Sequence, residues 1–170
     1  MEMTRLSKRE GALLLKIARK SLELAVREGK QLKLDLGDLP PALQKDGASF
    51  VTLTIQGRLR GCIGSLEAYQ PLALDVRDRA IHAALEDPRF NPVSVSELGE
   101  IKVEVSYLTE PKPFPYQSPA DLLEGLRPGV DGVVLKAGRR SATFLPQVWE
   151  QLPNPADFLS QLCLKMGARA

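Results

Sequence analysis

Histidine and cysteine are scarce in this chain of 170 residues, which has one histidine, His82, and two cysteines, Cys62 and Cys163. Neither cysteine has a partner at zinc-finger spacing, and a single histidine cannot supply an HExxH motif or a histidine pair. The common zinc motifs are therefore excluded, and we expect neither a metal ion nor a cofactor. Two isolated cysteines in a chain without an export signal are expected to be reduced rather than joined in a disulfide.

Long apolar runs and a strong charge of one sign are also lacking. No apolar run approaches membrane-spanning length, and the opening MEMTRLSKRE carries charges where a signal peptide has an apolar core, so we expect a cytoplasmic protein. The net charge is only +2, whereas binding to nucleic acid or membrane normally needs a clustered basic face. GxxxxGK, GxGxxG and GxSxG motifs are absent, which removes the usual signals for phosphate-binding loops and serine hydrolases.

What is present is an ordinary globular composition, with 44% hydrophobic and 26% charged residues. Helical patterns alternate with antiparallel hairpins rather than in regular βαβ units, which predicts an α+β fold with an antiparallel sheet and flanking helices. The proline-rich segment 109–119 predicts a connection between a larger and a smaller lobe of one domain, 1–170. Helices are expected at 7–29, 70–88, 118–126 and 154–166, a helical turn at 146–152, hairpins at 48–63 and 132–145, and a strand at 101–108.

The segment LRGCIGS, 59–65, raises the main chemical question. If Leu59, Gly61 and Ile63 face the core, strand alternation puts Arg60 and Cys62 together on the other face. A guanidinium near the sulfur would favour the thiolate, and we then expect a thiol pKa below the usual value of about 8.5. The alternative is that Cys62 is a small, buried filler.

Glycines flank this cysteine on both sides. Gly61 and Gly64 remove side chains, which allows another backbone or a ligand to approach closely. The alternative is that these glycines only shape a bulge or the end of a strand.

A nucleophilic thiol usually needs a base, and His82 is the only histidine available. We keep it as a weak candidate base, and the simpler interpretation is a solvated surface histidine. Cys163 has core spacing on the last expected helix, so we expect it to be packed rather than reactive. On a helical wheel His82 falls on a polar face with Asp75, Asp78, Arg79 and Glu86.

Three blocks together resemble the AMMECR domain family, whose bacterial and archaeal members are often named protein A of the AmmeMemoRadiSam system. The resemblance runs from about Phe50 to the C-terminus and implies an α+β fold with a larger lobe, a smaller sheet-rich lobe and a cleft between them. It also implies association with Memo-type and radical S-adenosylmethionine proteins, but no established reaction. The blocks are LRGCIG at 59–64, DPRF at 87–90 and TFLP at 143–146.

Three functions remain open at this point. A thiol-dependent enzyme or carrier would use Cys62 as nucleophile or attachment point for a small anionic substrate in the cleft. A noncatalytic adaptor would hold a partner in the same cleft, and a nucleic-acid-associated factor would rely on the basic first helix and on 138–140. For the first function, the expected substrate-binding residues are Arg60, Gly61, Gly64, Arg89 and Thr143.

Overall fold

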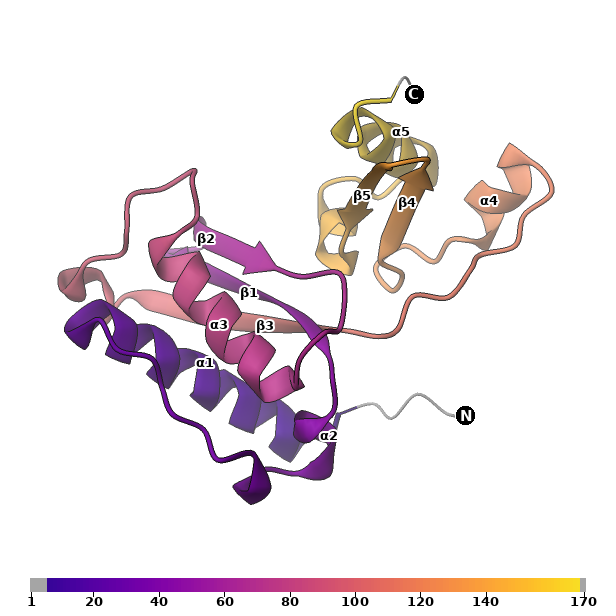
Figure 1. Ribbon diagram of the computed structural model, residues 1–170. Helices are drawn as coiled ribbons and strands as arrows, with labels where there is room; N and C mark the ends of the chain where they lie inside the picture. The colour runs from indigo at the N-terminus through magenta and orange to yellow at the C-terminus, as the bar shows by residue number, and fades with distance from the viewer. Residues whose placement is uncertain (1–5, 169–170) are drawn as a thin grey trace. The chain divides into compact units, whose positions relative to one another are not determined.

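The computed structural model describes residues 6–168. The chain divides after Thr109 into two compact units, Met1–Thr109 and Glu110–Ala170, called here the N-terminal and C-terminal units. The division falls at the start of the proline-rich segment 109–119. Both units combine helices with antiparallel strands, so the predicted α+β fold is confirmed (Figure 1).

The N-terminal unit places two long helices on one face of a three-stranded antiparallel sheet (Figure 1). Strand order is β2-β1-β3, so the strands of the first hairpin are neighbours and β3 pairs with the other side of β1. β2 and β3 are therefore the two edge strands. The elements are α1 (Lys8–Glu28), η1 (Leu36–Asp38), α2 (Pro41–Gln44), β1 (Ala48–Ile55), β2 (Arg58–Gly64), α3 (Leu72–Leu85), η2 (Val95–Glu97) and β3 (Ile101–Leu108).

Local sequence signals set the ends of α1. The Ser7 hydroxyl accepts from the Glu10 N–H at 3.2 Å, and the Glu10 carboxylate accepts from the Ser7 N–H at 2.7 Å. The helix ends at Gly29, whose φ of 64° suits a residue without a side chain. The predicted first helix is therefore confirmed, including both caps.

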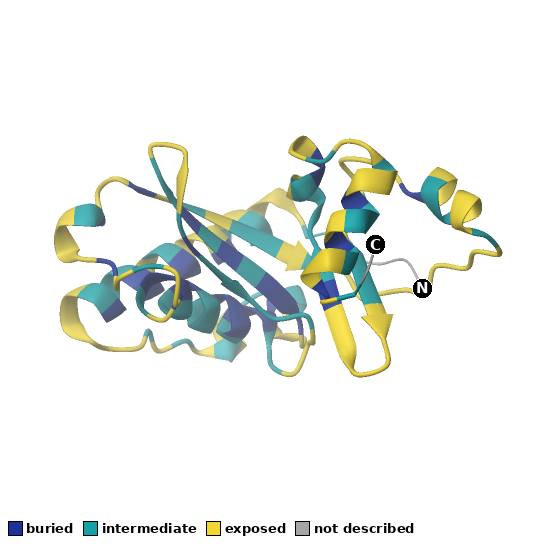
Figure 2. Cartoon of the chain, turned by 90° about the horizontal axis from the view of Figure 1, so that it is seen from above, coloured by how far each residue is buried: buried dark blue, intermediate teal, exposed yellow. Residues whose placement is uncertain are grey.

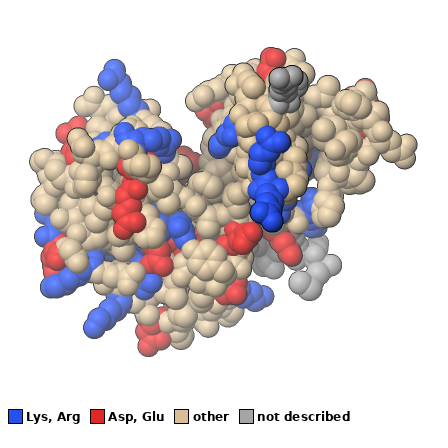
Figure 3. Space-filling view, turned by 45° about the horizontal axis from the view of Figure 1, so that its top comes forward, with Lys and Arg blue, Asp and Glu red and all other residues tan. Residues whose placement is uncertain are grey.

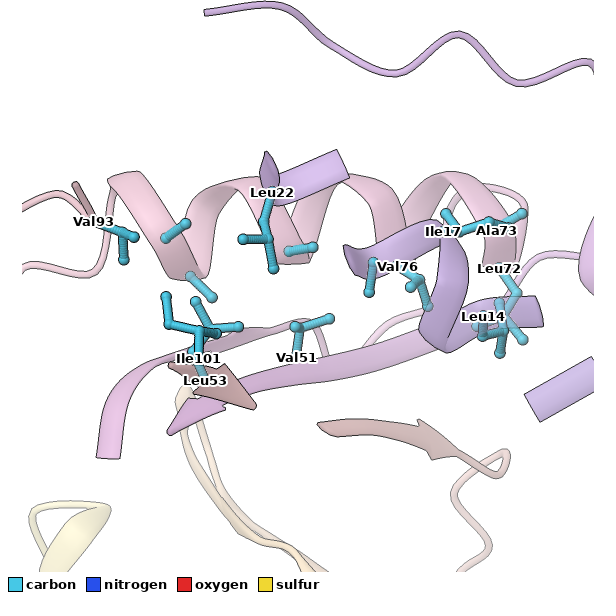
Figure 4. Close-up of a cluster of buried hydrophobic side chains, with 14 of the residues drawn as sticks. Leu14, Ile17, Leu22, Val51, Leu53, Leu72, Ala73, Val76, Val93 and Ile101 are labelled. Carbon is cyan, nitrogen blue, oxygen red and sulfur yellow. The ribbon is translucent and has the colours of Figure 1, made fainter. Parts of the chain in front are cut away.

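The core of the N-terminal unit lies between the helices and the sheet (Figure 4). Burial is concentrated on the central strand β1 and on the helix faces that meet it (Figure 2). Each fully buried aliphatic side chain contributes about 1.5–3 kcal/mol of transfer free energy. The core includes Leu14, Ile17 and Leu22 of α1, Val51 and Leu53 of β1, and Leu72 and Val76 of α3.

One charged residue that the helical wheel placed on the polar face of α3 is fully buried. Asp75 is 0% exposed and accepts hydrogen bonds from the N–H and hydroxyl of Ser49, at 2.8 and 2.6 Å. Ser65 and Arg79 also donate to it, each at 3.2 Å. A place on the polar face of the helical wheel therefore does not put Asp75 in solvent, because a carboxylate with this many donors can be buried between helix and sheet.

A bulge in the β1–β2 hairpin changes the expected alternation around Cys62. Leu53 pairs with Gly61 and Thr54 pairs with Leu59, so Arg60 is an extra residue without a partner on β1. Leu59 consequently does not face the core and is 43% exposed. The simple alternation that put Arg60 and Cys62 side by side is therefore wrong.

The C-terminal unit is small and has a two-stranded antiparallel sheet with a helix packed against it. Trp149 stacks on Phe158 with ring centroids 3.7 Å apart, and Phe144 meets Phe158 edge-on at 5.2 Å. These aromatic contacts organise its core. Its elements are α4 (Pro119–Gly125), β4 (Val133–Ala137), β5 (Arg140–Phe144), η3 (Pro146–Glu150) and α5 (Pro155–Lys165).

Two general properties bear on function. Within residues 6–168, no helix is long and apolar enough to cross a membrane. The same residues contain no cluster of three histidine, cysteine, aspartate or glutamate side chains that could hold a metal ion.

Candidate functional site

The Cys62 side chain lies on the face of the three-stranded sheet opposite to α1 and α3, the face that also carries Phe50 and Thr52. Cys62 pairs with Thr52 in the register, whereas the neighbouring Val51 and Leu53 point into the core beneath the helices. The Thr52 hydroxyl lies 3.2 Å from the Cys62 sulfur. Cys62 is a free thiol and is partly buried, and whether it is reactive or a small filler stays open.

Helix α3 crosses directly over Gly61. A Cβ built at this glycine would lie 2.1 Å from the backbone carbonyl oxygen of Ala83. That carbonyl is in the last turn of α3, where intrahelical acceptors lack donors, so a weak Cα–H···O contact from Gly61 suits it. The predicted close approach at Gly61 is therefore an approach of the protein's own backbone.

Gly64 has an equally close neighbour. A Cβ at this position would lie 2.2 Å from the Phe50 ring. Both glycines of the LRGCIG block thus have packing roles, one against a helix and one against an aromatic side chain.

The DPRF block closes the outer edge of β2 at Cys62. Asp87 accepts from the Cys62 N–H at 2.9 Å, and the Arg89 guanidinium donates to the Cys62 carbonyl at 3.3 Å. Arg89 also binds both Asp87 carboxylate oxygens, at 3.0 and 2.8 Å. Both backbone groups of Cys62 are therefore held by an ion pair, which fixes the position of its side chain.

This ion pair shifts the ionisation of both partners. Hydrogen bonds from the Arg89 side chain hold the pKa of Asp87 well below its usual range, and the N–H groups of Cys62 and Arg89 act in the same direction. The pKa of Arg89 is raised, chiefly by its hydrogen bonds to Asp87 and also by attraction to a negative charge on Cys62.

Arg60 is engaged elsewhere. Its guanidinium binds Glu97 through Nε at 2.7 Å and through Nη2 at 3.2 Å. These bonds, with the Ser94 N–H, lower the pKa of Glu97 to about 2. Both guanidinium groups lie near the Phe90 ring, whose centroid is 5.9 Å from Arg60 and 5.6 Å from Arg89. Arg89 is consequently the arginine bonded to the Cys62 backbone, whereas Arg60 is fixed to η2.

His82, the weak candidate base, has a partner on its own helix, α3. His82 Nε2 lies 3.9 Å from a carboxylate oxygen of Glu86, one turn later. This arrangement is the ordinary i, i+4 pair of a surface helix. A role for His82 as the base of Cys62 stays a prediction without a supporting contact.

Two further sequence candidates lie in the C-terminal unit. Thr143 is on β5, opposite Val134, and among residues 6–168 its buried hydroxyl oxygen has no hydrogen-bond partner. Its role in substrate binding stays a prediction. Cys163 of α5 is a free thiol and only partly buried, because Phe158 and Leu162 carry the buried face of that helix.

Thr52 and Glu97 belong to the site but were not singled out from the sequence. Thr52 stands opposite Cys62 only because of the bulge, and regular pairing from the turn would have placed it opposite Gly61. Glu97 is far from Arg60 in the sequence, and no local pattern signals their contact.

Surface charge on the N-terminal unit is mixed. On the face drawn in Figure 3, lysine and arginine are interspersed with aspartate and glutamate. A surface of this kind does not favour a phosphate backbone as ligand.

Comparison with known proteins places the chain among archaeal relatives. The AMMECR1 family model matches residues 15–170. A protein of Methanothermobacter thermautotrophicus is 44% identical over 168 residues, covering 98% of this chain and 87% of that protein. A protein of Thermofilum pendens is 39% identical over 178 residues, covering 98% and 83%. The crystal structure of an uncharacterized protein from Pyrococcus horikoshii matches with a TM-score of 0.89 and 32% identity, over 96% of this chain and 83% of that one.

Proposed function

The chain belongs to the AMMECR1 family, and from that premise and the geometry at Cys62 we propose that it acts as a thiol-dependent enzyme or carrier for a small anionic substrate. The observation that carries this proposal is that the other residues of the LRGCIG and DPRF blocks around Cys62 have structural contacts of their own. Gly61 and Gly64 are used for packing, Arg60 is bound to Glu97, and Asp87 with Arg89 fixes the Cys62 backbone. The thiol is the group that this framework presents.

The chemistry required of Cys62 is simple nucleophilic attack. The sulfur forms a bond to an electrophilic carbon of the substrate, and the bond from that carbon to its leaving group breaks. The leaving group takes the electron pair and the thiol proton. An enzyme would then release the bound group, whereas a carrier would keep it until a partner accepts it.

Arg89 supports an anionic substrate. Its side chain is 55% exposed, and its hydrogen bonds to residues 6–168 use the N–H, Nε and Nη2 groups. The Nη1 group can therefore donate to an incoming anion beside the thiol. On the strength of the resemblance alone, we also propose Memo-type and radical S-adenosylmethionine proteins as partners.

The competing function is an adaptor in which the thiol only fills space. The two functions differ in whether a small anion reaches Cys62 in the folded protein. The alkylation rates of Cys62 with anionic iodoacetate and neutral iodoacetamide separate them, measured by mass spectrometry in a Cys163→Ala background. We expect the iodoacetate to iodoacetamide ratio to be about two- to fivefold higher in the folded than in the unfolded protein.

The arginine variants make this test specific. The ratio should fall to the unfolded value in Arg89→Gln, persist in Arg89→Lys, and change little in Arg60→Gln, because Arg60 is held by Glu97. Thermal melting of each variant reports whether the fold is retained. Equal ratios in the folded and unfolded protein, or a ratio insensitive to Arg89, would overturn the anionic substrate.

A further inference from the structure

Cys62 and Thr52 form the type of cross-strand pair that brings two side chains closest together. The Cys62 N–H donates to Asp87 and its carbonyl accepts from Arg89, so both backbone groups of Cys62 point away from β1. In an antiparallel sheet, a pair without backbone hydrogen bonds has its Cα atoms about 4.5 Å apart, roughly 1 Å closer than a bonded pair. The sheet itself therefore holds the thiol and the hydroxyl side by side.

The Thr52 hydroxyl is committed to the sulfur. It lies 3.2 Å from the Cys62 sulfur, and within residues 6–168 it has no other hydrogen-bond partner. Threonine is β-branched, so its χ1 angle is restricted and the hydroxyl keeps its place. Thr54 lies on the same face of β1 but pairs with Leu59 and Lys102 instead. Of these two threonines, only Thr52 bonds to the thiol.

The direction of this hydrogen bond depends on the state of the sulfur. While the thiol is protonated, either atom can be the donor. A thiolate has no proton, so only the Thr52 hydroxyl can then donate. A hydrogen bond to an ionised group is about twice as strong as one between neutral groups. The bond therefore stabilises the ionised form of Cys62 more than the neutral form.

Charged side chains of the N-terminal unit lie around this pair, but none of them comes from β1. Thr52 is uncharged, so its replacement leaves these charges unchanged and isolates the effect of the hydroxyl. The charged residues are Arg60 of β2, which is bound to Glu97, Asp87 and Arg89 at the edge of β2, and Lys102 and Glu104 of β3 on the same face as Thr52.

We propose that Thr52 is a positioning residue for Cys62, whose hydroxyl donates a hydrogen bond to the thiolate and holds the sulfur for attack. The inference rests on the proposed function, because it concerns the same thiol. In the attack a sulfur lone pair forms the bond to the electrophilic carbon, and the hydroxyl keeps its own proton. The proton that the thiol lost on ionisation is replaced on the leaving group from solvent. Thr52 is thus neither the base nor the nucleophile.

The ionisation of Cys62 can be followed without a reagent, from the cysteine ¹³Cβ chemical shift against pH in the Cys163→Ala background. Thr52→Val removes the hydroxyl with little change in size and should raise the midpoint of this titration by about one pH unit. Thr52→Ser keeps a hydroxyl and should titrate close to the parent. Thr54→Val makes the same change on the same face, away from the sulfur, and should also titrate like the parent.

Four results would overturn the inference. They are an unchanged or lowered midpoint in Thr52→Val, an equal shift in Thr54→Val, no recovery in Thr52→Ser, and a parent thiol that stays protonated until the protein unfolds in alkali. A purely structural role for Thr52 would change the melting temperature without moving the midpoint.

Alkylation by iodoacetamide separates this inference from the proposed function. Where the thiol is reached, Thr52→Val should lower the rate at pH 7 about threefold, because a roughly tenfold loss of thiolate is partly offset by the greater nucleophilicity of a less acidic thiol. An unchanged or higher rate would contradict the role of Thr52. A folded parent that resists alkylation but shows the shifted midpoint would overturn the thiol function while supporting the hydrogen bond from Thr52.

Discussion

Replacing Gly61 by valine is expected to destabilise the protein by about 3 kcal/mol, at the upper end of the range for overpacked sites. The reason is steric, since the new Cβ would lie 2.1 Å from the Ala83 carbonyl oxygen. That atom belongs to the backbone of α3 and cannot rotate away as a side chain can. Either the helix or the strand must move, and the melting temperature should fall by about 10 °C or more.

Gly99→Ala is the control for this substitution. A Cβ at Gly99 meets no atom within 4 Å, and the residue needs no left-handed backbone. Its melting temperature should stay close to that of the parent protein. A Gly61→Val variant that melts with the parent would show that α3 does not pack on this glycine.

Replacing Asp87 by alanine should cost about 3 kcal/mol, measured by urea unfolding. The substitution leaves the Cys62 N–H without its acceptor and the Arg89 guanidinium without its counter-ion. Asp87→Asn should cost less, because its amide oxygen can still accept from Cys62. Glu67→Ala removes an exposed carboxylate and serves as the control. A loss of stability no larger than that of Glu67→Ala would contradict the role of Asp87 in holding the Cys62 backbone at the edge of β2.

The Asp87 carboxylate also makes the free energy of unfolding depend on pH. Because the pKa of Asp87 is lower in the folded than in the unfolded protein, its contribution is complete above the unfolded value of about 4. That contribution is lost as the pH falls towards the folded value. Glu97, with a pKa lowered to about 2, acts in the same direction. The free energy of unfolding should therefore fall below about pH 4, and less steeply in Asp87→Asn than in the parent.

Much of the fold could be predicted because its signals are local. The capping box of Ser7 and Glu10 and the alternation of β3 each lie within a few residues, so neighbouring side chains decide the structure. The burial of Asp75 could not be predicted, because its donor Ser49 lies on another element and is joined to it only in the folded chain. A helical wheel treats every charged residue as solvated.

Some residues of the candidate site could be named from the sequence, but their contacts could not. Cys62 and Arg89 were both named from the sequence, yet the link between them runs through the carbonyl of Cys62 and the carboxylate of Asp87. Arg60 was expected beside the sulfur, and the bulge directs it to Glu97 instead. A bulge adds one residue to one strand, and nothing in the alternating pattern of LRGCIG marks where that residue falls.

The proposed function requires that the folded protein presents the Cys62 thiol to small molecules. The most direct test is the rate of iodoacetamide alkylation at Cys62 in the Cys163→Ala variant, measured in the folded and the unfolded state. We expect Cys62 to react in the folded protein faster than global unfolding permits. A thiol reached only through global unfolding would react more slowly than in the unfolded chain by a factor of about 10³ or more, and that result would rule out the proposed thiol function.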